Sequence, residues 1–247
     1  MTSLDALTIL QLYPDELGVT GDSGNVLALR VRLERAGVPV QVVRHQVGDT
    51  LPAQVDAIVI GNGPLSAMRV VLDDLHANAP TLRAWVEQDV PVLAVGAGME
   101  LLGETITAPD AERIEGIGIF PITTARGGDR RVGYLTVSTT VGDVVGFEDH
   151  STRTDRREAL AFGTVSAGVT GSRGLGDGIR VREAIGTRVQ GPVLPLNPVL
   201  TDSLLAAALR RRGLTWAPGQ VTESLDTLAA NARAVILRHI DHAFSSI

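Results

Sequence analysis

The chain contains no cysteine, and its 247 residues include no lysine either, so all 22 basic residues are arginine. Without cysteine there is no thiol nucleophile, disulfide, zinc–thiolate site or cysteine-held iron–sulfur cluster. Without lysine there is no Schiff-base amine and no P-loop lysine that could reach a nucleotide phosphate. The two absences exclude several kinds of catalytic chemistry before any motif is considered.

Aromatic residues make up only 3% of the chain, and the formal net charge is −6 with a sequence pI of about 5.4. Nucleic-acid-binding domains are usually basic and stack bases on aromatic side chains, so we expect no nucleic-acid partner. No apolar run reaches the roughly 18 residues of a membrane span, so we expect no membrane insertion. The opening residues lack the basic stretch of a signal peptide, and we therefore expect a cytoplasmic protein.

The first hundred residues alternate short apolar runs with helical patterns. Four apolar runs predict buried strands: 7–12, 38–44, 57–60 and 90–95. Helical spacing is found at 25–35 and at 68–88, where a break is expected near Pro80. Continuous apolar strands that alternate with helices indicate an α/β fold, with a mostly parallel sheet flanked by helices.

The middle of the chain, residues 114–186, is rich in Gly, Thr, Val and Arg, and its short alternating segments predict antiparallel or mixed β-structure. Two amphipathic helices are expected after it, at 197–212 and 221–244. No internal repeat or low-complexity linker separates these parts. We therefore expect one domain over residues 1–247, with a C-terminal helical extension at about 214–247.

Three glycine-containing turns follow predicted strands: 61–64 (GNGP), 96–98 (GAG) and 186–192 (GTRVQGP). Ligands of parallel α/β sheets bind at the carboxyl ends of the strands. Each turn alone is most simply a tight connection between a strand and a helix. Together they lie where such a fold builds an active site.

Three sets of motifs occur in the order found in a known family. They are LYPD at 12–15 with GDSGN at 21–25, GFEDH at 146–150 with Arg153-Thr154, and GTRVQGPVLPLNP at 186–198. The chain thereby resembles class I glutamine amidotransferases of the cobyric acid synthase type. Within them it is most similar to the glutamine amidotransferase subunits of lipid II isoglutaminyl synthase, which carry GFENH and GTYLHGPLLPKNP in the last two places. The likeness covers about residues 7–209.

The resemblance implies a flavodoxin-like fold and a glutamine-hydrolysing site. In the family, a cysteine on a strand-to-helix elbow attacks the glutamine side-chain amide, a histidine is its base, and backbone N–H groups stabilise the oxyanion. Here the elbow segment VLAVGAGMELLG (92–103) has Gly96 in place of the cysteine, and Gln190 stands in place of the histidine. Glycine has no side chain to attack with, and glutamine does not titrate near neutral pH.

The residues around these two positions also depart from the family pattern. The family's Gly-Gly-Tyr-Gln after the cysteine is Ala97-Gly98-Met99-Glu100 here, and its GGGQ-like oxyanion loop is Gly61-Asn62-Gly63-Pro64. Proline has no N–H to donate. We therefore expect a pseudoenzyme with no intact catalytic residue. The candidates for its emptied pocket or oxyanion loop are Gly61, Asn62, Gly63, Ala97, Gly98 and Met99.

The family subunit docks on a Mur-ligase-like enzyme, so the resemblance implies a heterodimer that serves ATP-dependent amide formation in cell-wall precursor synthesis. Residues of the retained motifs are candidates to face that partner: Asp15, Asp22, Asn25, His150 and Arg153. We expect neither a cofactor nor a metal ion. Two alternatives stay open. One is an active amidotransferase with a relocated nucleophile, for which Ser66, Thr105, Thr107 and Ser151 lie near the motifs. The other is a small-molecule binding or sensor module.

The arginine-rich segments 126–131 and 153–157 carry a further possibility. They could bind anionic groups or an acidic face of a partner. The simpler interpretation is a solvated surface.

Overall fold

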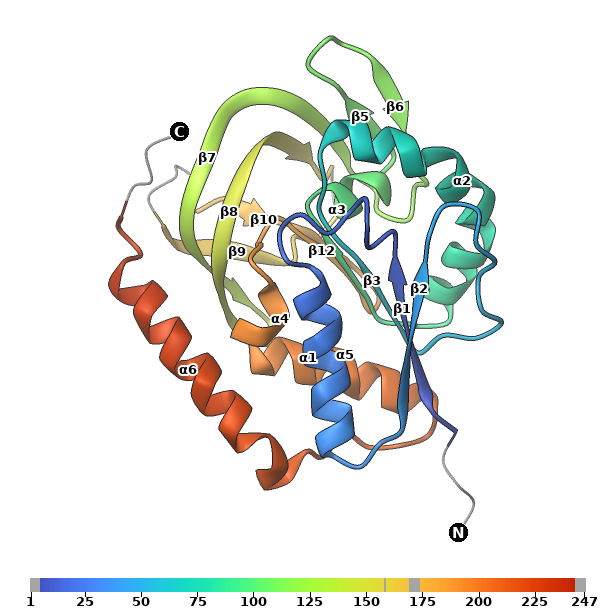
Figure 1. Cartoon of the computed structure of the whole chain (residues 1–247). Coiled ribbons are helices and arrows are strands. Elements are labelled where there is room, and N and C mark those ends of the chain that lie inside the picture. Colours follow the sequence, from blue (N-terminus) through green and yellow to red (C-terminus); the bar gives the residue numbers. More distant parts are fainter. Residues whose placement is uncertain (1–4, 158, 169–173, 243–247) are drawn as a thin grey trace.

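The computed structural model describes residues 5–157, 159–168 and 174–242 and contains two sheets (Figure 1). The first sheet has six strands in the order β11–β12–β4–β3–β1–β2. These strands are β1 (Leu7–Leu12), β2 (Val40–His45), β3 (Ala57–Ile60), β4 (Val92–Val95), β11 (Ile179–Val181) and β12 (Ala184–Thr187). All neighbours pair in parallel except β11, which is antiparallel to β12. The mostly parallel sheet predicted from the alternating pattern is confirmed.

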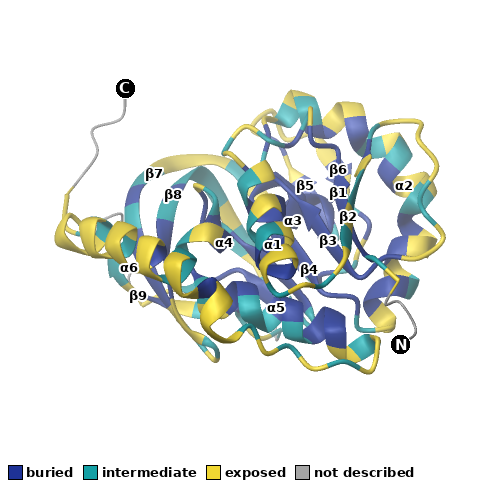
Figure 2. Ribbon diagram, turned by 60° about the horizontal axis from the view of Figure 1, so that its bottom comes forward, coloured by how far each residue is buried: buried dark blue, intermediate teal, exposed yellow. Residues whose placement is uncertain are grey.

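Helices cover both faces of this sheet. The described helices are α1 (Ser23–Arg35), α2 (Leu65–Glu87), α3 (Ala97–Leu101), α4 (Val193–Leu196), α5 (Pro198–Arg211) and α6 (Glu223–Arg238), with a 3₁₀ turn η1 (Gly219–Thr222). Alternate strand residues point to opposite faces. Leu10 and Ile58 therefore pack with the apolar side of α2, whereas Ile9 and Val59 pack with α1 and α5. The inner strands β1, β3, β4 and β12 are buried from both sides (Figure 2).

Helix α2 runs unbroken through Pro80, so the expected break there is wrong. Proline inside a helix removes one backbone hydrogen bond and clashes with the preceding turn. The apolar stripe of α2 continues on both sides of Pro80, with Leu75 and Leu82 each at most 2% exposed. Packing of this stripe against the sheet outweighs the local cost of the proline.

The second sheet confirms the mixed β-structure expected in the middle of the chain. Its strands are β5 (Thr105–Thr107), β6 (Arg113–Glu115), β7 (Thr123–Thr139), β8 (Gly142–Asp155), β9 (Gly163–Gly168) and β10 (Gly176–Asp177). Strands β7 and β8 form a long antiparallel ribbon that arches beside the first sheet (Figure 1). The register of the ribbon shifts between Arg126 and Arg131.

Helix α6 lies at the periphery, and only Ala229 among its residues is buried (Figure 2). Ion pairs and hydrogen bonds tie it to the core: Arg32 of α1 binds Asp226, and Arg233 binds Asn197. The sequence expected a helix over 221–244, of which 243–244 lie outside the described residues. The division into one domain with a helical extension stays a prediction. None of the described helices has both the length and the apolar run to cross a membrane.

Candidate functional site

The turn between β4 and α3 places Gly96 at the carboxyl end of the central strand. Gly96 has φ 53° and ψ −111°, a conformation that side-chain-bearing residues rarely adopt. Its N–H donates to the Thr187 carbonyl at 2.9 Å, which holds the turn against β12. A sharp, strained turn from strand to helix is the backbone of a nucleophile elbow. The elbow therefore persists here although its residue has no side chain.

The side chain of Asn62, from the loop after β3, occupies the space in front of the elbow. A Cβ atom added at Gly96 would overlap the Asn62 amide oxygen and lie 2.6 Å from Asn62 Cγ. The same oxygen accepts a hydrogen bond from the Ala97 N–H at 2.9 Å. In elbow enzymes the N–H after the nucleophile is one of the oxyanion donors. Here that donor is already bonded within the chain.

In the loop at Gly61–Gly63, the second expected source of oxyanion donors, the Asn62 N–H is also engaged. The Asn62 N–H donates to Asp22 Oδ2 at 3.1 Å, and Thr20 Oγ1 donates to the same carboxylate oxygen at 2.8 Å. Asp22 is 1% exposed, and its burial raises the pKa of the carboxyl group in spite of these hydrogen bonds. The Asp22 carboxylate and the Asn62 amide thus take up N–H groups that a reacting oxyanion would need.

Gln190, at the position of the family's histidine, is bonded to β8. Its backbone pairs with that of Phe147 in an isolated bridge, and its Nε2 donates to the Asp149 carbonyl at 3.3 Å. The residue is 3% exposed. Its amide therefore links β12 to the β7–β8 ribbon and offers no base.

A buried ion pair supports the far side of the elbow. Glu100 of α3 accepts a hydrogen bond from Arg126 Nε of β7 at 2.6 Å, and their side chains are 4% and 16% exposed. Burial raises the pKa of Glu100, against the attraction of Arg126, His150 and Arg188. Glu100 is not among the candidate residues predicted from the sequence. Its position in the motif could have indicated it, because the resemblance places Glu100 where the family has glutamine.

The residues expected to face a partner divide into exposed and buried positions. Asp15 and Arg153 are exposed. Asp22 is buried as described, and Asn25 is 0% exposed, with its Oδ1 accepting a hydrogen bond from the Leu194 N–H at 2.9 Å. In this conformation neither Asp22 nor Asn25 presents its side chain to a partner. Asp22 joins the loop before α1 to the loop after β3, and Asn25 joins the start of α1 to α4.

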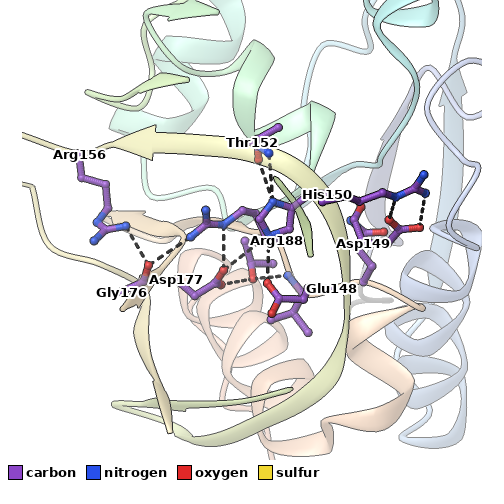
Figure 3. Close-up of polar contacts among 12 residues, drawn as sticks. Glu148, Asp149, His150, Thr152, Arg156, Gly176, Asp177 and Arg188 are labelled. Carbon is purple, nitrogen blue, oxygen red and sulfur yellow. Dashed lines mark hydrogen bonds and ion pairs between the residues drawn. The ribbon is translucent and has the colours of Figure 1, made fainter. Parts of the chain in front are cut away.

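His150 is likewise directed into the chain, with a side chain that is 8% exposed (Figure 3). Its Nε2 lies 3.0 Å from Glu148 Oε2, and its Nδ1 accepts the Thr152 N–H at 3.3 Å. The Thr152 hydroxyl oxygen is 3.1 Å from the same Nδ1. Glu148, His150 and Thr152 are alternate residues of β8, so their side chains share one side of the strand. The result is a row of carboxylate, imidazole and hydroxyl.

The serines and threonines proposed as replacement nucleophiles are not arranged in this way. Ser66, Thr105, Thr107 and Ser151 form no hydrogen bond to a histidine within the described parts of the chain, and Thr105 accepts one from Arg113. Across residues 5–157, 159–168 and 174–242, no group of three or more His, Asp or Glu side chains could hold a metal ion.

Comparison with known proteins extends the resemblance seen in the motifs. Residues 8–197 match the family described as the CobB/CobQ-like glutamine amidotransferase domain. The subunit GatD of lipid II isoglutaminyl synthase (glutamine-hydrolyzing) from Staphylococcus aureus is 31% identical over 230 residues, which cover 90% of this chain and 93% of that protein. The GatD subunit of Streptococcus pneumoniae is 28% identical over 213 residues, covering 83% and 82%.

Among solved structures, the glutaminase domain of Trypanosoma brucei CTPS, crystallised with acivicin, aligns with a TM-score of 0.55. The alignment covers 87% of this chain and 97% of that chain at 14% identity. A likeness at this level of identity concerns the fold, which is that of class I glutamine amidotransferases.

Proposed function

We propose a non-catalytic role for this chain, which belongs to the family of CobB/CobQ-like glutamine amidotransferase domains. In this proposal it is an amidotransferase-like subunit that does not hydrolyse glutamine itself. One observation carries it: the Asn62 amide oxygen accepts the Ala97 N–H and fills the space where a nucleophile at Gly96 would lie.

The chemistry of amide hydrolysis supports the proposal. The reaction needs a nucleophile, a base that removes its proton, and free donors for the oxyanion. Gly96 supplies no nucleophile, and Gln190 supplies no base. The donors at Ala97 and Asn62 are bonded to the chain's own carbonyl and carboxylate oxygens. Three requirements are therefore unmet at once, and replacement of a single residue does not restore them.

The relatives' names support a role within a complex, since each is called a subunit of lipid II isoglutaminyl synthase. We infer that this chain forms a cytoplasmic heterodimer with a Mur-ligase-like, ATP-dependent amide ligase of cell-wall precursor synthesis. It would support the fold or placement of that ligase, and ammonia would come from another source. The exposed Asp15 and Arg153 are the retained motif residues that can reach such a partner.

A glutaminase assay tests the loss of catalysis. The purified chain, alone and with its ligase partner, is expected to release no glutamate from glutamine above the level of the partner alone. Release above that level would overturn the proposal. Gly96→Cys by itself is expected to stay unlabelled by a glutamine-derived electrophile because Asn62 blocks the new thiol. The triple variant Gly96→Cys, Gln190→His, Asn62→Gly is expected to gain labelling at the new cysteine.

Co-expression tests the partnership. The chain is expected to elute with a Mur-ligase-like protein from the same cell, and the ligase is expected to lose activity or solubility when expressed without it. Charge reversal at Arg153 (Arg153→Glu) is expected to weaken the complex more than reversal at the exposed Arg113 of β6 (Arg113→Glu). Separate elution of the two wild-type proteins would exclude the heterodimer but leave the glutaminase result unaffected.

One observation favours a second candidate, an amidotransferase with a relocated nucleophile. The Thr152 hydroxyl lies beside His150, which in turn contacts Glu148, as in a nucleophile–base–carboxylate relay. We rank it second because Thr152 lies within a strand and its own N–H is bonded to His150. The same electrophile separates the two candidates: labelling of the wild-type chain at Thr152, absent in Thr152→Val, would favour the relocated nucleophile.

A further inference from the structure

A cavity of about 710 Å³ opens beside the β7–β8 ribbon, away from the filled elbow. Residues of β7, β8 and β10 line it, together with Arg188, which follows β12. Among the described residues, its lining contains five arginines: Arg130, Arg131, Arg153, Arg156 and Arg188. Asp129 is the acidic residue of this described lining. The chain as a whole is acidic, so this concentration of positive charge is local.

Arg130 and Arg188 each contact a carboxylate. Arg130 forms a two-pronged ion pair with Asp149, with distances of 2.7 and 2.9 Å. Arg188 Nε lies 3.5 Å from Oδ1 of the buried Asp177. The Thr187 hydroxyl donates a hydrogen bond to the other carboxylate oxygen, Asp177 Oδ2, at 2.5 Å. The charge of Arg130 is thus matched by a close partner, whereas Arg188 has one longer contact to a carboxylate that also serves another donor.

Arg156 and Arg188 approach each other around one carbonyl group in the cavity wall (Figure 3). Arg156 Nη1 donates to the Gly176 carbonyl at 3.0 Å, and Arg188 Nη2 donates to the same oxygen at 3.2 Å. A carbonyl oxygen carries no full charge, so it does not neutralise two guanidinium groups. Arg188 is 11% exposed at its side chain, and solvent therefore screens the repulsion only in part. An anion placed between the two groups would relieve it.

The remaining lining is suited to a small polar ligand. Arg153 makes no hydrogen bond or ion pair with any other described residue and is exposed toward solvent. Ser151, Gly127 and Gly128 also belong to the lining. The described lining contains no aromatic ring, so a ligand is held by charge and hydrogen bonds, not by stacking. The volume falls in the range of small-molecule sites.

We propose that this cavity is a binding site for a compact ligand that carries a phosphate or diphosphate group. Arg156 and Arg188 would hold one anionic group between them, and Arg153 would meet a second from the open side. Phosphate oxygens match the planar fork of arginine in two-pronged contacts. Free glutamine has a single carboxylate balanced by its ammonium group, so it fits this cluster poorly. The site is separate from the elbow and does not depend on whether the chain hydrolyses glutamine.

Calorimetric titration of the full chain with pyrophosphate and with inorganic phosphate tests the proposal. Pyrophosphate is expected to bind saturably with one site per chain and more tightly than phosphate. Binding is expected to weaken several-fold as the salt concentration rises from about 50 to about 200 mM, because exposed charges are screened over that range. A titration with no saturable heat for either anion would overturn the proposal.

Arginine variants inside and outside the cavity test whether the anion binds there. Arg156→Gln and Arg153→Gln are each expected to weaken pyrophosphate binding about tenfold, as loss of a charge-assisted hydrogen bond predicts. Arg113→Gln is the control, because Arg113 is an exposed arginine on β6 that pairs with Glu115 outside the cavity. Arg153 is exposed and unpaired, so its variant is expected to fold even if Arg156→Gln does not. Equal weakening by all three variants would show unspecific anion attraction and refute the site.

A glutamate-rich peptide serves as a further probe, because it imitates the acidic surface of a protein partner. The proposal expects it to bind more weakly than pyrophosphate and to be displaced by it. If the peptide binds with cavity-dependent affinity while pyrophosphate does not, the cluster is a protein-docking surface and the proposal is wrong. If glutamine competes with pyrophosphate at equal concentration, the assignment of the ligand class is also wrong.

Discussion

The filled elbow and the arginine cavity are neighbours with opposite electrostatic character. Asp149 lies between them, because its carbonyl accepts from Gln190 and its carboxylate pairs with Arg130. Around the elbow, polar groups that a reaction would need free are bonded to each other, as Asn62 is to Ala97. In the cavity, Arg156 and Arg188 both donate to the Gly176 carbonyl, and the ion pair of Arg188 with Asp177 is long, at 3.5 Å.

The difference between the two regions lies in whether their polar groups are satisfied within the chain. A site whose donors are satisfied internally adds to stability but has nothing to offer a ligand. A site with excess like charge gains nothing for the free chain and favours an anionic ligand. Substitutions near the elbow should therefore cost stability, and those in the cavity should cost binding alone.

The largest loss of stability is expected from Glu100→Ala, which leaves Arg126 partly buried without its carboxylate. Removal of one member of a buried pair typically costs about 3–5 kcal/mol. Urea unfolding followed by circular dichroism measures it. Glu104→Ala is the control, because Glu104 pairs with the exposed Arg157 and its loss should cost under about 1 kcal/mol. Similar values for both variants would contradict the tightly packed elbow.

A smaller loss, about 2–3 kcal/mol, is expected for Gly96→Ala, because a methyl group there is strained by the backbone and overlaps Asn62. Part of this loss should be recovered in the double variant with Asn62→Gly, which clears the space. The unfolding free energies of the four proteins form a double-mutant cycle. Strict additivity of the two changes would show that Asn62 does not fill the elbow.

The pH dependence of stability gives a weaker but signed test. Burial raises the pKa of Asp22 in the folded chain. Ionisation of Asp22 therefore destabilises the folded chain. This cost is absent below the pKa of the unfolded chain, near 4, and grows as the pH rises through the raised pKa of the folded chain. The stability of the wild type relative to Asp22→Asn should therefore fall with increasing pH. Chemical unfolding at a series of pH values measures this difference.

Asp74 lies outside both regions and serves as a control, because its effect on stability should change with pH in the opposite direction. Burial acts to raise the pKa of Asp74, but hydrogen bonds from His45, Gly48 and Tyr13 outweigh it and hold the pKa below its usual value. The stability it adds is present above the unfolded pKa and is lost as pH falls toward the folded one. Wild type relative to Asp74→Asn should gain stability as pH rises. The same slope for Asp22 and Asp74 would refute the contrast.

The smallest effect is expected in the cavity. Arg156→Gln should change the unfolding free energy by no more than about 0.5 kcal/mol, because the lost hydrogen bond to Gly176 is offset by relief of repulsion from Arg188. Thermal unfolding without pyrophosphate measures the change in stability, and unfolding with pyrophosphate measures the loss of stabilisation by the ligand. Destabilisation as large as that of Glu100→Ala would mean that Arg156 is a structural element of the ribbon.

Much of the fold could be predicted from local pattern. The strands at 7–12 and 57–60 have the predicted bounds because their apolar runs are flanked by turn residues. The sequence could not show that α2 continues through Pro80, since that depends on packing on both sides of the proline. Nor could it show that Asp22 and Asn25 are buried, because polar residues in a loop are usually exposed and their partners lie far along the chain.

The sequence by itself determined that there is no thiol or lysine chemistry and that Gly96 and Gln190 stand where the resemblance places the family's cysteine and histidine. These facts do not depend on the fold, because a functional group that is absent from the sequence is absent in every conformation. Only the tertiary structure decided that Asn62 lies in the emptied space and that Arg156 and Arg188 meet at one carbonyl. Such pairings join separate elements, and only folding brings those elements within hydrogen-bonding distance.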